Sequence, residues 1–585
     1  MTARGAAVKK IKALTTSIAL LFGTAFSLSG CSSLPTSGKV EYIPEVASHE
    51  QRSRVNVAAL PPQPGASAEM IVEGFLAAME SSADDYSVAK QYLTPQAAEQ
   101  WDPTSGVLVY SNESSFEKES SNVLKLPLTE VGNLSGEGLY SSKTPRSSTV
   151  RLRLQEVDGE LRISNPMTGI LLSQQRFVRS FTPLKAYFVA NDEKSLAHQL
   201  VYVPSRQVSM DETVRTVIRG PGEWLRPVVK NYAQDASIES ETWIDNDQIA
   251  RVSLNDVAEE VVTKKGELLA AQLLTSLQDI YRVKGIKVSV NGKALKMPGG
   301  GPSDVLLASQ SSLTSVHSEE SAGLLGVFQG APARLSDNGQ PQVLESFEQA
   351  GVGPVTRIAG QNADIAVIAE GDREIWLSKN AEPPERVFTG SNIRSLQYAA
   401  SYLWWLGDVE GEPTIFRLSE DGTVASRQTK ALQGRKIAAL AISPDGVYGA
   451  LSVNDDRGKS FGLVRIDNSK ELSVDGWREI PLNWNEGKIN SVSDVAWSSG
   501  SNLLLLGVTE DRTEIFATDS DASALSSLGP YGDVETVKLA AQKRGPLTSL
   551  LAITNTARVL HFEEQYRWPV YAQEISDVSY VVKSE

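Results

Sequence analysis

Five segments with a common pattern recur in the C-terminal half of the chain. Each has an apolar strand, a turn with Gly, Asn or Pro, and further short strands. They begin at Val355, Ile393, Ile437, Val492 and Val534, at spacings of 38, 44, 55 and 42 residues. Several short strands per unit, with a period of about 40–45 residues, are typical of a β-propeller. The repeat therefore predicts an all-β propeller over residues 323–585.

The two ends of this half predict how the propeller closes. Residues 323–336 have the pattern of the later strands of a unit that lacks its first strand. Residues 575–582, ISDVSYVV, match the first strand VSDVAW of the fourth copy. Pairing the two segments would complete one more unit and would protect sheet edges that are otherwise exposed. We expect about six blades, with seven as the alternative.

A first α+β domain is predicted over residues 66–182. Its first helix has Ser67 as a possible N-cap and places Met70, Phe75 and Met79 at helical spacing. A second helical segment is interrupted before Pro95, and short strands follow. Helices followed by a run of strands favour an α+β domain. This order resembles the NTF2-like fold.

A second α+β domain is predicted over residues 183–296. It has a helix ending at Gly220-Pro221, a hairpin around Asn246-Asp247 and a long amphipathic helix. Its RGP turn, its ARVSLN strand and its final VSVNG resemble the GerMN domain. That resemblance implies a binding or assembly module rather than an enzyme. Residues 297–322, which begin MPGGGPS, are expected to form a linker.

The single cysteine stands at the end of an apolar N-terminal run that follows several basic residues. The run is shorter than the about 20 apolar residues of a membrane-spanning helix and is typical of a secretory signal. Leu28-Ser29-Gly30-Cys31 resembles a bacterial lipobox. The resemblance implies a lipoprotein signal peptide over residues 1–30 that is cleaved between Gly30 and Cys31. The Cys31 thiol then carries a diacylglycerol and the new amino group an acyl chain such as palmitate.

Lipidation of Cys31 would consume the only thiol, so the mature chain would have no disulfide and no cysteine metal ligand. Residues 31–65 end in Pro61-Pro62-Gln63-Pro64-Gly65 and are predicted to be a flexible, lipid-anchored tether. The net charge of −15 argues against nucleic acid, which needs a basic surface, and against polybasic contact with lipid. We therefore expect attachment to the cell membrane through the lipid alone, on the extracytoplasmic face.

Short catalytic or metal-binding motifs occur, but their contexts argue against chemistry. Gly458–Gly462 fits G-x-S-x-G but falls in a predicted loop between two strands, whereas a nucleophile elbow joins a strand to a helix. Ser87–Lys90 and Ser336–Asn338 fit two motifs of penicillin-binding enzymes but lie in different domains. Asp519–Asp521 begins like a calcium loop and lacks its later Gly and Glu. We expect no catalytic residue, no metal and no cofactor other than the lipid on Cys31.

Adjacent tryptophans mark one propeller strand. Trp404 and Trp405 must point to opposite faces of that strand. Either both pack in the core, or one of them faces the channel or a partner. Trp497 has the same two interpretations.

The order of lipobox, NTF2-like segment, GerMN segment and propeller resembles the actinobacterial LpqB lipoprotein family over nearly the whole mature chain. The resemblance implies an accessory lipoprotein that binds the extracytoplasmic sensor domain of an MtrB-like histidine kinase. It would modulate an MtrAB-like two-component system, and with it cell-envelope homeostasis and division. Two alternatives stay open: a lipoprotein that holds an envelope glycan or peptidoglycan fragment in the propeller channel, and an unrecognised envelope hydrolase.

Overall fold

A computed structural model provides the coordinates. It describes residues 59–80, 86–113, 115–297, 304–311, 313, 323–429, 433–456, 458–469, 471–484, 487–510, 512–530, 534–544, 547–564 and 566–583. These residues all belong to one compact unit, Val55–Glu585. The signal peptide, the lipobox with Cys31 and the tether up to residue 58 lie outside the described residues.

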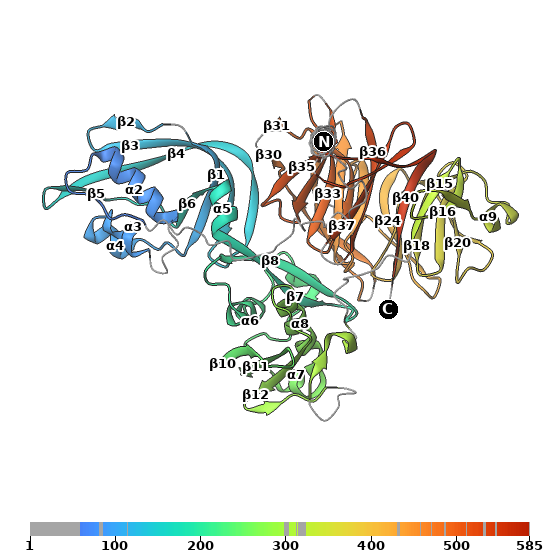
Figure 1. Ribbon diagram of the computed structural model, residues 1–585, viewed down its shortest axis with the longest axis horizontal. Coiled ribbons are helices and arrows are strands. Elements are labelled where there is room, and N and C mark those ends of the chain that lie inside the picture. Colours follow the sequence, from blue (N-terminus) through green and yellow to red (C-terminus); the bar gives the residue numbers. More distant parts are fainter. Residues whose placement is uncertain are drawn as a thin grey trace, which may run out of the picture. The chain divides into compact units, whose positions relative to one another are not determined.

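The first domain packs short helices against a strongly twisted sheet with the order β5-β4-β3-β1-β6, and β2 pairs with β3. Figure 1 shows α2 lying against this sheet. Thr94, whose Oγ1 accepts the N–H of Ala97 at 3.3 Å, caps α4, and the helical segment is interrupted before Pro95 as predicted. The elements are α2 (Ala68–Glu80), α3 (Ser87–Gln91), α4 (Pro95–Gln100), β1 (Gly106–Glu113), β2 (Glu117–Ser120), β3 (Val123–Ser135), β4 (Tyr140–Val157), β5 (Glu160–Ile163), β6 (Ile170–Ser173) and α5 (Gln174–Ser180).

Helix α2 begins where predicted, because the Ser67 hydroxyl accepts the N–H of Met70 at 3.3 Å. Phe75 and Met79 are buried in the core of the domain, together with Ile71. Met70 was predicted to share their face, and that prediction is wrong: its side chain is 53% exposed. The apolar stripe of the helix runs through the residue after Met70, and Met70 lies on its solvent edge.

The second domain has two sheets, β8-β7-β9 and β10-β11-β12-β13, and β14 pairs with β12. Gly220, at φ 87°, ends α6 before Pro221, and a turn at Asn246-Asp247 joins β10 to β11, both as predicted. The elements are β7 (Phe181–Ala190), β8 (Leu196–Pro204), α6 (Met210–Arg219), η1 (Arg226–Val228), β9 (Val229–Lys230), β10 (Ser237–Ile244), β11 (Ile249–Asn255), α7 (Glu259–Lys264), α8 (Gly266–Gln278), β12 (Gly285–Val290), β13 (Lys293–Ala294), β14 (Leu306–Leu307) and η2 (Ala308–Gln310).

The predicted boundaries of the second domain differ from its strands. The predicted start at residue 183 falls inside β7, which pairs with β8 along its whole length. The predicted linker 297–322 contains β14, which pairs with Gly285 and Ile286 of β12. Leu306 is 3% exposed, so burial of this side chain favours extension of the sheet beyond the Gly-rich segment.

Among the described residues, the propeller has four four-stranded antiparallel sheets and one eight-stranded sheet, β17-β16-β15-β40-β18-β19-β20-β21, in which β40 and β18 pair in parallel and join two groups of four strands. The strands are β15 (Leu324–Phe328), β16 (Ala331–Leu335), β17 (Pro341–Val343), β18 (Val355–Gln361), β19 (Asp364–Ala369), β20 (Glu374–Ser378), β21 (Glu385–Thr389), β22 (Ser391–Ala399), β23 (Tyr402–Val409), β24 (Glu412–Leu418), β25 (Val424–Arg427), β26 (Ile437–Ile442), β27 (Tyr448–Asp455), β28 (Gly458–Asp467), β29 (Ser473–Glu479), β32 (Ser491–Trp497), β33 (Asn502–Val508), β34 (Thr513–Asp519), β35 (Leu525–Gly529), β36 (Thr536–Arg544), β37 (Leu547–Thr554), β38 (Arg558–His561), β39 (Val570–Gln573) and β40 (Ile575–Val582).

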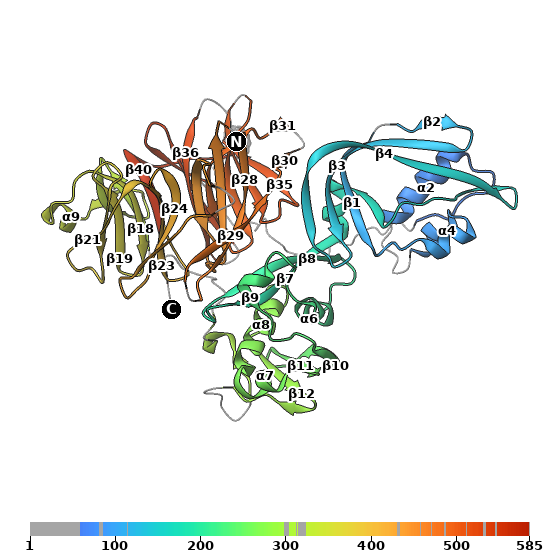
Figure 2. The same ribbon diagram turned by 180° about the vertical axis from the view of Figure 1, so that it is seen from behind.

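Strand β40 closes the ring in the predicted way. It pairs with β15 antiparallel from Leu324–Tyr580 to Phe328–Ile575, so the last strand of the chain completes the group that β15, β16 and β17 begin. Figure 1 shows β40 beside β15 and β18, and Figure 2 shows β40 and β18 from behind. The short helix α9 (Glu345–Gln349) lies between β17 and β18 in the chain. The hairpin of β30 (Asn483–Trp484) and β31 (Gly487–Lys488) lies between β29 and β32 and accounts for the longest repeat spacing.

Both adjacent tryptophans are core residues. Trp404 and Trp405 are each 0% exposed, and they belong to two separate apolar clusters. Trp404 packs with Leu440 of β26, on the next group of strands, while Trp405 packs with Ile368 of β19, on the preceding one. Because both faces of a propeller blade meet a neighbouring blade, opposite orientations bury both rings. The interpretation that one ring faces the channel or a partner is therefore wrong.

Candidate functional site

A cavity of about 900 Å³ occupies the propeller channel. Its wall is formed by the first strand of each group, namely β18, β22, β26, β32, β36 and β40. Residues of the second domain line it as well, from the turn before β8, the end of α8 and the segment after β14: Lys194, Leu274, Thr275, Gln278, Ala308, Ser311 and Leu313. The cavity is therefore built by two domains that are far apart in sequence.

Side chains of the inner strands bond the backbone of the next inner strand. Asp494 of β32 accepts the N–H of Leu539 at 2.8 Å, and Asp577 of β40 accepts the N–H of Ile358 at 2.8 Å. These two aspartates occupy the same position in VSDVAW and ISDVSY. The sequence repeat therefore places the same hydrogen bond, from a backbone N–H to an aspartate, at two points of the ring. Asp577 also forms an ion pair with Lys538, which stands on β36 between them. The C-terminal strand is thus bonded to both neighbouring blades.

Neutral side chains also bond the backbone of neighbouring inner strands. The Gln397 amide accepts the N–H of Ile442 at 2.9 Å and donates to the carbonyl of Leu440 at 3.1 Å. Trp497, 7% exposed, donates its indole N–H to the carbonyl of Ala441 at 3.0 Å and also lines the channel cavity, so contact with a ligand stays open for it. These contacts give hydrogen-bond partners to backbone groups at the channel wall. A buried backbone group left without a partner would lower the stability of the fold.

The cavity wall carries a carboxyl group, that of Asp494, with a raised pKa. Burial raises the pKa of Asp494 to about 6, although the nearby Lys538 ammonium lowers it. Burial likewise raises the pKa of the Tyr398 phenol above its ordinary value, so Tyr398 is a neutral hydroxyl at physiological pH. The channel therefore presents neutral hydroxyls alongside a small number of charges.

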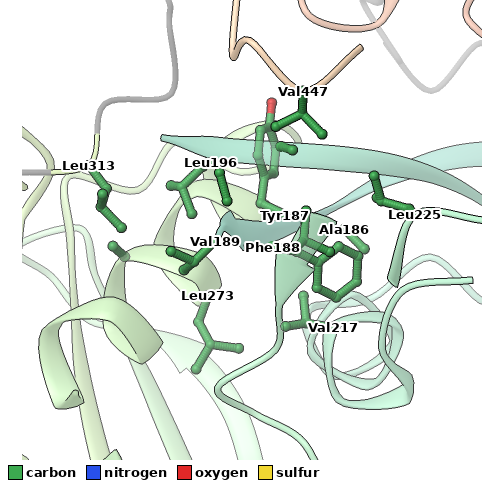
Figure 3. Packing of buried hydrophobic residues seen from close by; sticks show 14 of the residues in the cluster. Ala186, Tyr187, Phe188, Val189, Leu196, Val217, Leu225, Leu273, Leu313 and Val447 are labelled. Atoms are coloured by element: carbon green, nitrogen blue, oxygen red, sulfur yellow. The ribbon is translucent and has the colours of Figure 1, made fainter. Parts of the chain in front are cut away.

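A second candidate site is the joint between the second domain and the propeller. Ser195, just before β8, donates to the carbonyl of Asp445 at 2.8 Å, and Tyr448 of β27 donates to the carbonyl of His198 at 2.7 Å. Trp224 stacks on Tyr448, with ring centroids 5.8 Å apart. Figure 3 shows Val447 of the propeller close to Tyr187 of β7 within one buried cluster. The two domains therefore share a core.

The first domain also contacts the propeller. The Asn483 side-chain amide donates to the carbonyls of Val131 and Lys143, each at 2.9 Å. The Ser142 hydroxyl donates to the carbonyl of Pro481 at 2.7 Å. The hairpin inserted into the propeller repeat thus holds β3 and β4 of the first domain.

Carboxyl groups gather in the turns of the joint. Asp445 is 4% exposed, and burial raises its pKa to about 6. Asp519 is partly buried; burial and, to a smaller extent, the neighbouring Asp521 charge raise its pKa to about 7. Tyr202 of β8 contacts Ser523 at 2.5 Å and Asp521 at 3.4 Å through its hydroxyl. The joint therefore contains groups that change charge near neutral pH.

The structure separates the motifs that resembled enzyme signatures. Ser460 lies inside strand β28 and not in the predicted loop, so G-x-S-x-G has no helix after it. Ser87 and Lys90 lie on α3 of the first domain, whereas Ser336 and Asn338 form a turn between β16 and β17. Within the described ranges, no three His, Cys, Asp or Glu side chains are grouped to hold a metal ion. Cys31 lies outside the described residues, and its lipidation stays a prediction.

Two family models match the chain. Residues 61–178 match "Lipoprotein LpqB, N-terminal domain", and residues 185–296 match "Sporulation and spore germination". Proteins named lipoprotein LpqB are similar along most of their length. The one from Cutibacterium acnes is 25% identical over 96% of this chain and 98% of the relative. Those from Streptomyces avermitilis and Nocardia farcinica are 26% and 23% identical, over 82% and 96% of this chain and 84% and 97% of the relatives.

Solved structures resemble parts of the chain. TolB from Acinetobacter baumannii covers 53% of this chain and 86% of its own, with 16% identity and a TM-score of 0.31. The tandem GerMN domains of the sporulation protein GerM from Bacillus subtilis cover 20% of this chain and 41% of their own, with 19% identity and a TM-score of 0.16. In the part of the chain that the structure describes, no helix is long and apolar enough to cross a bilayer.

The fold and these matches define a class: a membrane-anchored lipoprotein in which α+β domains, one of them GerMN-like, precede a β-propeller. The relatives bear the name of a lipoprotein and not of an enzyme. The chain is similar to LpqB lipoproteins along most of its length, and residues 61–178 match the N-terminal domain of that family.

Proposed function

We propose that this protein is an accessory lipoprotein that binds the extracytoplasmic sensor domain of a two-component histidine kinase of the MtrAB type and modulates its signalling. It is held on the outer face of the cell membrane by lipid on Cys31. The observation that carries the proposal is similarity to LpqB lipoproteins along nearly the whole chain. Cell-envelope homeostasis and division are the outputs that we expect to respond.

The joint supports a binding role. Because the second domain and the propeller share a core, their exposed faces form one body that a partner meets as a unit. Anchoring both proteins in one membrane raises their effective concentration, so a weak contact is sufficient. To change signalling, the lipoprotein must bind one conformation of the kinase more tightly than the other.

The second domain offers a specific place to test. Trp243 is 55% exposed on β10, which is the edge strand of its sheet. Tryptophan is enriched among the residues that dominate interface energies. Met70, 53% exposed on α2 of the first domain, is an apolar side chain of similar exposure and serves as the matched control.

The experiment places the full-length lipoprotein and the purified kinase in one bilayer and measures their association and the rate of kinase autophosphorylation. We expect saturable association that Trp243→Ala weakens about tenfold and Met70→Ala leaves unchanged. A change in autophosphorylation should follow association. No association at about 1 mM effective concentration would contradict the proposal.

A further inference from the structure

The charges around the channel cavity oppose the charge of the whole chain. The chain has 71 Asp and Glu against 56 Lys and Arg. Among the described residues that line the cavity, the charged ones are three lysines and one aspartate: Lys194, Lys538, Lys583 and Asp494. Lys538 is paired with Asp577 in the wall. The side chains of Lys194 and Lys583 are exposed. A surplus of one sign in a concave site raises the local concentration of the opposite charge. The cavity thus favours an anionic molecule.

The lining also indicates which kind of anion fits. Six serines line the cavity: Ser311, Ser395, Ser401, Ser498, Ser499 and Ser579. The hydroxyls of four of them, Ser311, Ser498, Ser499 and Ser579, already donate within the chain. A hydroxyl that donates can still accept, so these serines suit a ligand whose own hydroxyls donate. The rings of Tyr398 and Tyr580 add aromatic surface to the same wall. At about 900 Å³, the cavity lies at the upper end of the range for small-molecule sites.

We propose that the channel cavity binds a short anionic saccharide, with its carboxylate near Lys194 and Lys583 and its hydroxyls against the serine-lined wall. Polymers of the cell envelope are a source of such saccharides. The site is independent of the proposed kinase contact. Asp494 is the one lining carboxylate among the described residues, so lysines supply most of the charge on the cavity wall. A ligand that complements this wall carries negative charge.

The first experiment uses the full-length chain in detergent micelles and isothermal titration calorimetry. The probes are a β-linked disaccharide with one uronate carboxylate and the methyl ester of the same disaccharide, which lacks the charge. We expect saturable binding of the uronate and at least about fivefold weaker binding of the ester. No binding of either probe at about 10 mM would overturn the proposal. Equal binding of both would overturn the anionic assignment.

Point variants locate the site. We expect the double variant Lys194→Gln, Lys583→Gln to weaken uronate binding about tenfold and to leave ester binding nearly unchanged. The matched control, Lys118→Gln with Lys293→Gln, removes two exposed lysines from β2 and β13 and should change neither affinity. Equal losses in the two double variants would overturn the assignment of the site, because they would show a dependence on net charge alone.

A filling variant and a competitor complete the test. Ser579→Trp places a large ring into the cavity from β40 and should abolish binding of both probes, while the thermal unfolding midpoint reports whether the chain still folds. Retained binding in a folded Ser579→Trp protein would overturn the cavity as the site. Inorganic phosphate at the same concentration should not displace the uronate, and displacement would overturn the assignment to a saccharide.

Discussion

Two aspartates of the propeller are almost completely buried, and their surroundings differ in one respect. Asp577, 0% exposed in the seam that closes the ring, forms an ion pair with Lys538 and accepts a backbone N–H. Asp445, 4% exposed in the joint with the second domain, accepts hydrogen bonds from Ser443 and from the N–H of Val447 at one oxygen. Among the described residues, its other oxygen has no hydrogen-bond donor. Asp577 is thus an ion-paired latch between the closing strand and its neighbours. Asp445 is a carboxyl group without a cation, and burial drives it toward protonation.

The difference follows from the cost of burying charge. A buried carboxylate remains ionised when a cation and hydrogen bonds replace its water, and removal of one partner then leaves the other charge buried. A buried carboxylate without a cation is destabilised as an anion, so its pKa rises. The stability of the joint should therefore respond to pH through Asp445.

Loss of the latch should produce the largest effect. Asp577→Ala leaves the Lys538 ammonium without its carboxylate and the N–H of Ile358 without its acceptor, so we expect the free energy of unfolding to fall by about 3–5 kcal/mol. Urea unfolding followed by circular dichroism measures it. The control is Glu471→Ala, which removes an exposed partner 4.0 Å from Arg427 and should have little effect. Equal stability of the two variants would contradict the role of Asp577 as a latch.

The joint should produce a smaller effect that depends on pH. Burial raises the pKa of Asp445 from an ordinary 3.8 to about 6, so the folded state holds the proton more tightly. The wild-type stability contributed by this group is fully present below about pH 4, is lost as the pH rises through 6, and is constant above that. We expect wild type to lose about 3 kcal/mol over this window relative to Asp445→Asn.

Urea unfolding of the two proteins at a series of pH values gives the difference profile for Asp445. Subtraction removes the titration of the other carboxyl groups, which both proteins share. A flat difference for Asp445 would show that the carboxylate is stabilised by contacts other than those described, and would break the contrast with the seam.

Local sequence patterns predicted the propeller and its closure, but not the joint. The closing strand was predictable because ISDVSY repeats VSDVAW, so Asp577 and Asp494 occupy matching positions. The joint depends on pairs such as Ser195 and Asp445, which are 250 residues apart and carry no common pattern. In the sequence, Asp445 stands in SPDG, which is typical of an exposed turn.

Burial on two sides hid the connection between the first two domains. Tyr202 of β8 belongs to the core of the first domain, while Val201, the residue before it, belongs to the core of the second. A strand that is buried on both faces does not alternate between apolar and polar residues. Its sequence therefore does not indicate which domain packs on each face. The predicted boundary at residue 183 therefore fell inside the β7–β8 pair. The predicted lipobox depends on four consecutive residues and on no contact with distant parts of the chain.

The smallest expected effect tests whether hydrogen bonds, and not apolar packing alone, hold the joint. Tyr448→Phe keeps the ring that stacks on Trp224 and removes the hydroxyl that donates to the carbonyl of His198. A buried carbonyl left without its donor should cost about 1 kcal/mol. Amide hydrogen exchange along β8 should become faster, while exchange along β40 should not change, since β40 belongs to the seam. If exchange rises equally in both strands, the joint and the seam unfold as one cooperative unit, and the contrast between them is one of charge and not of local stability.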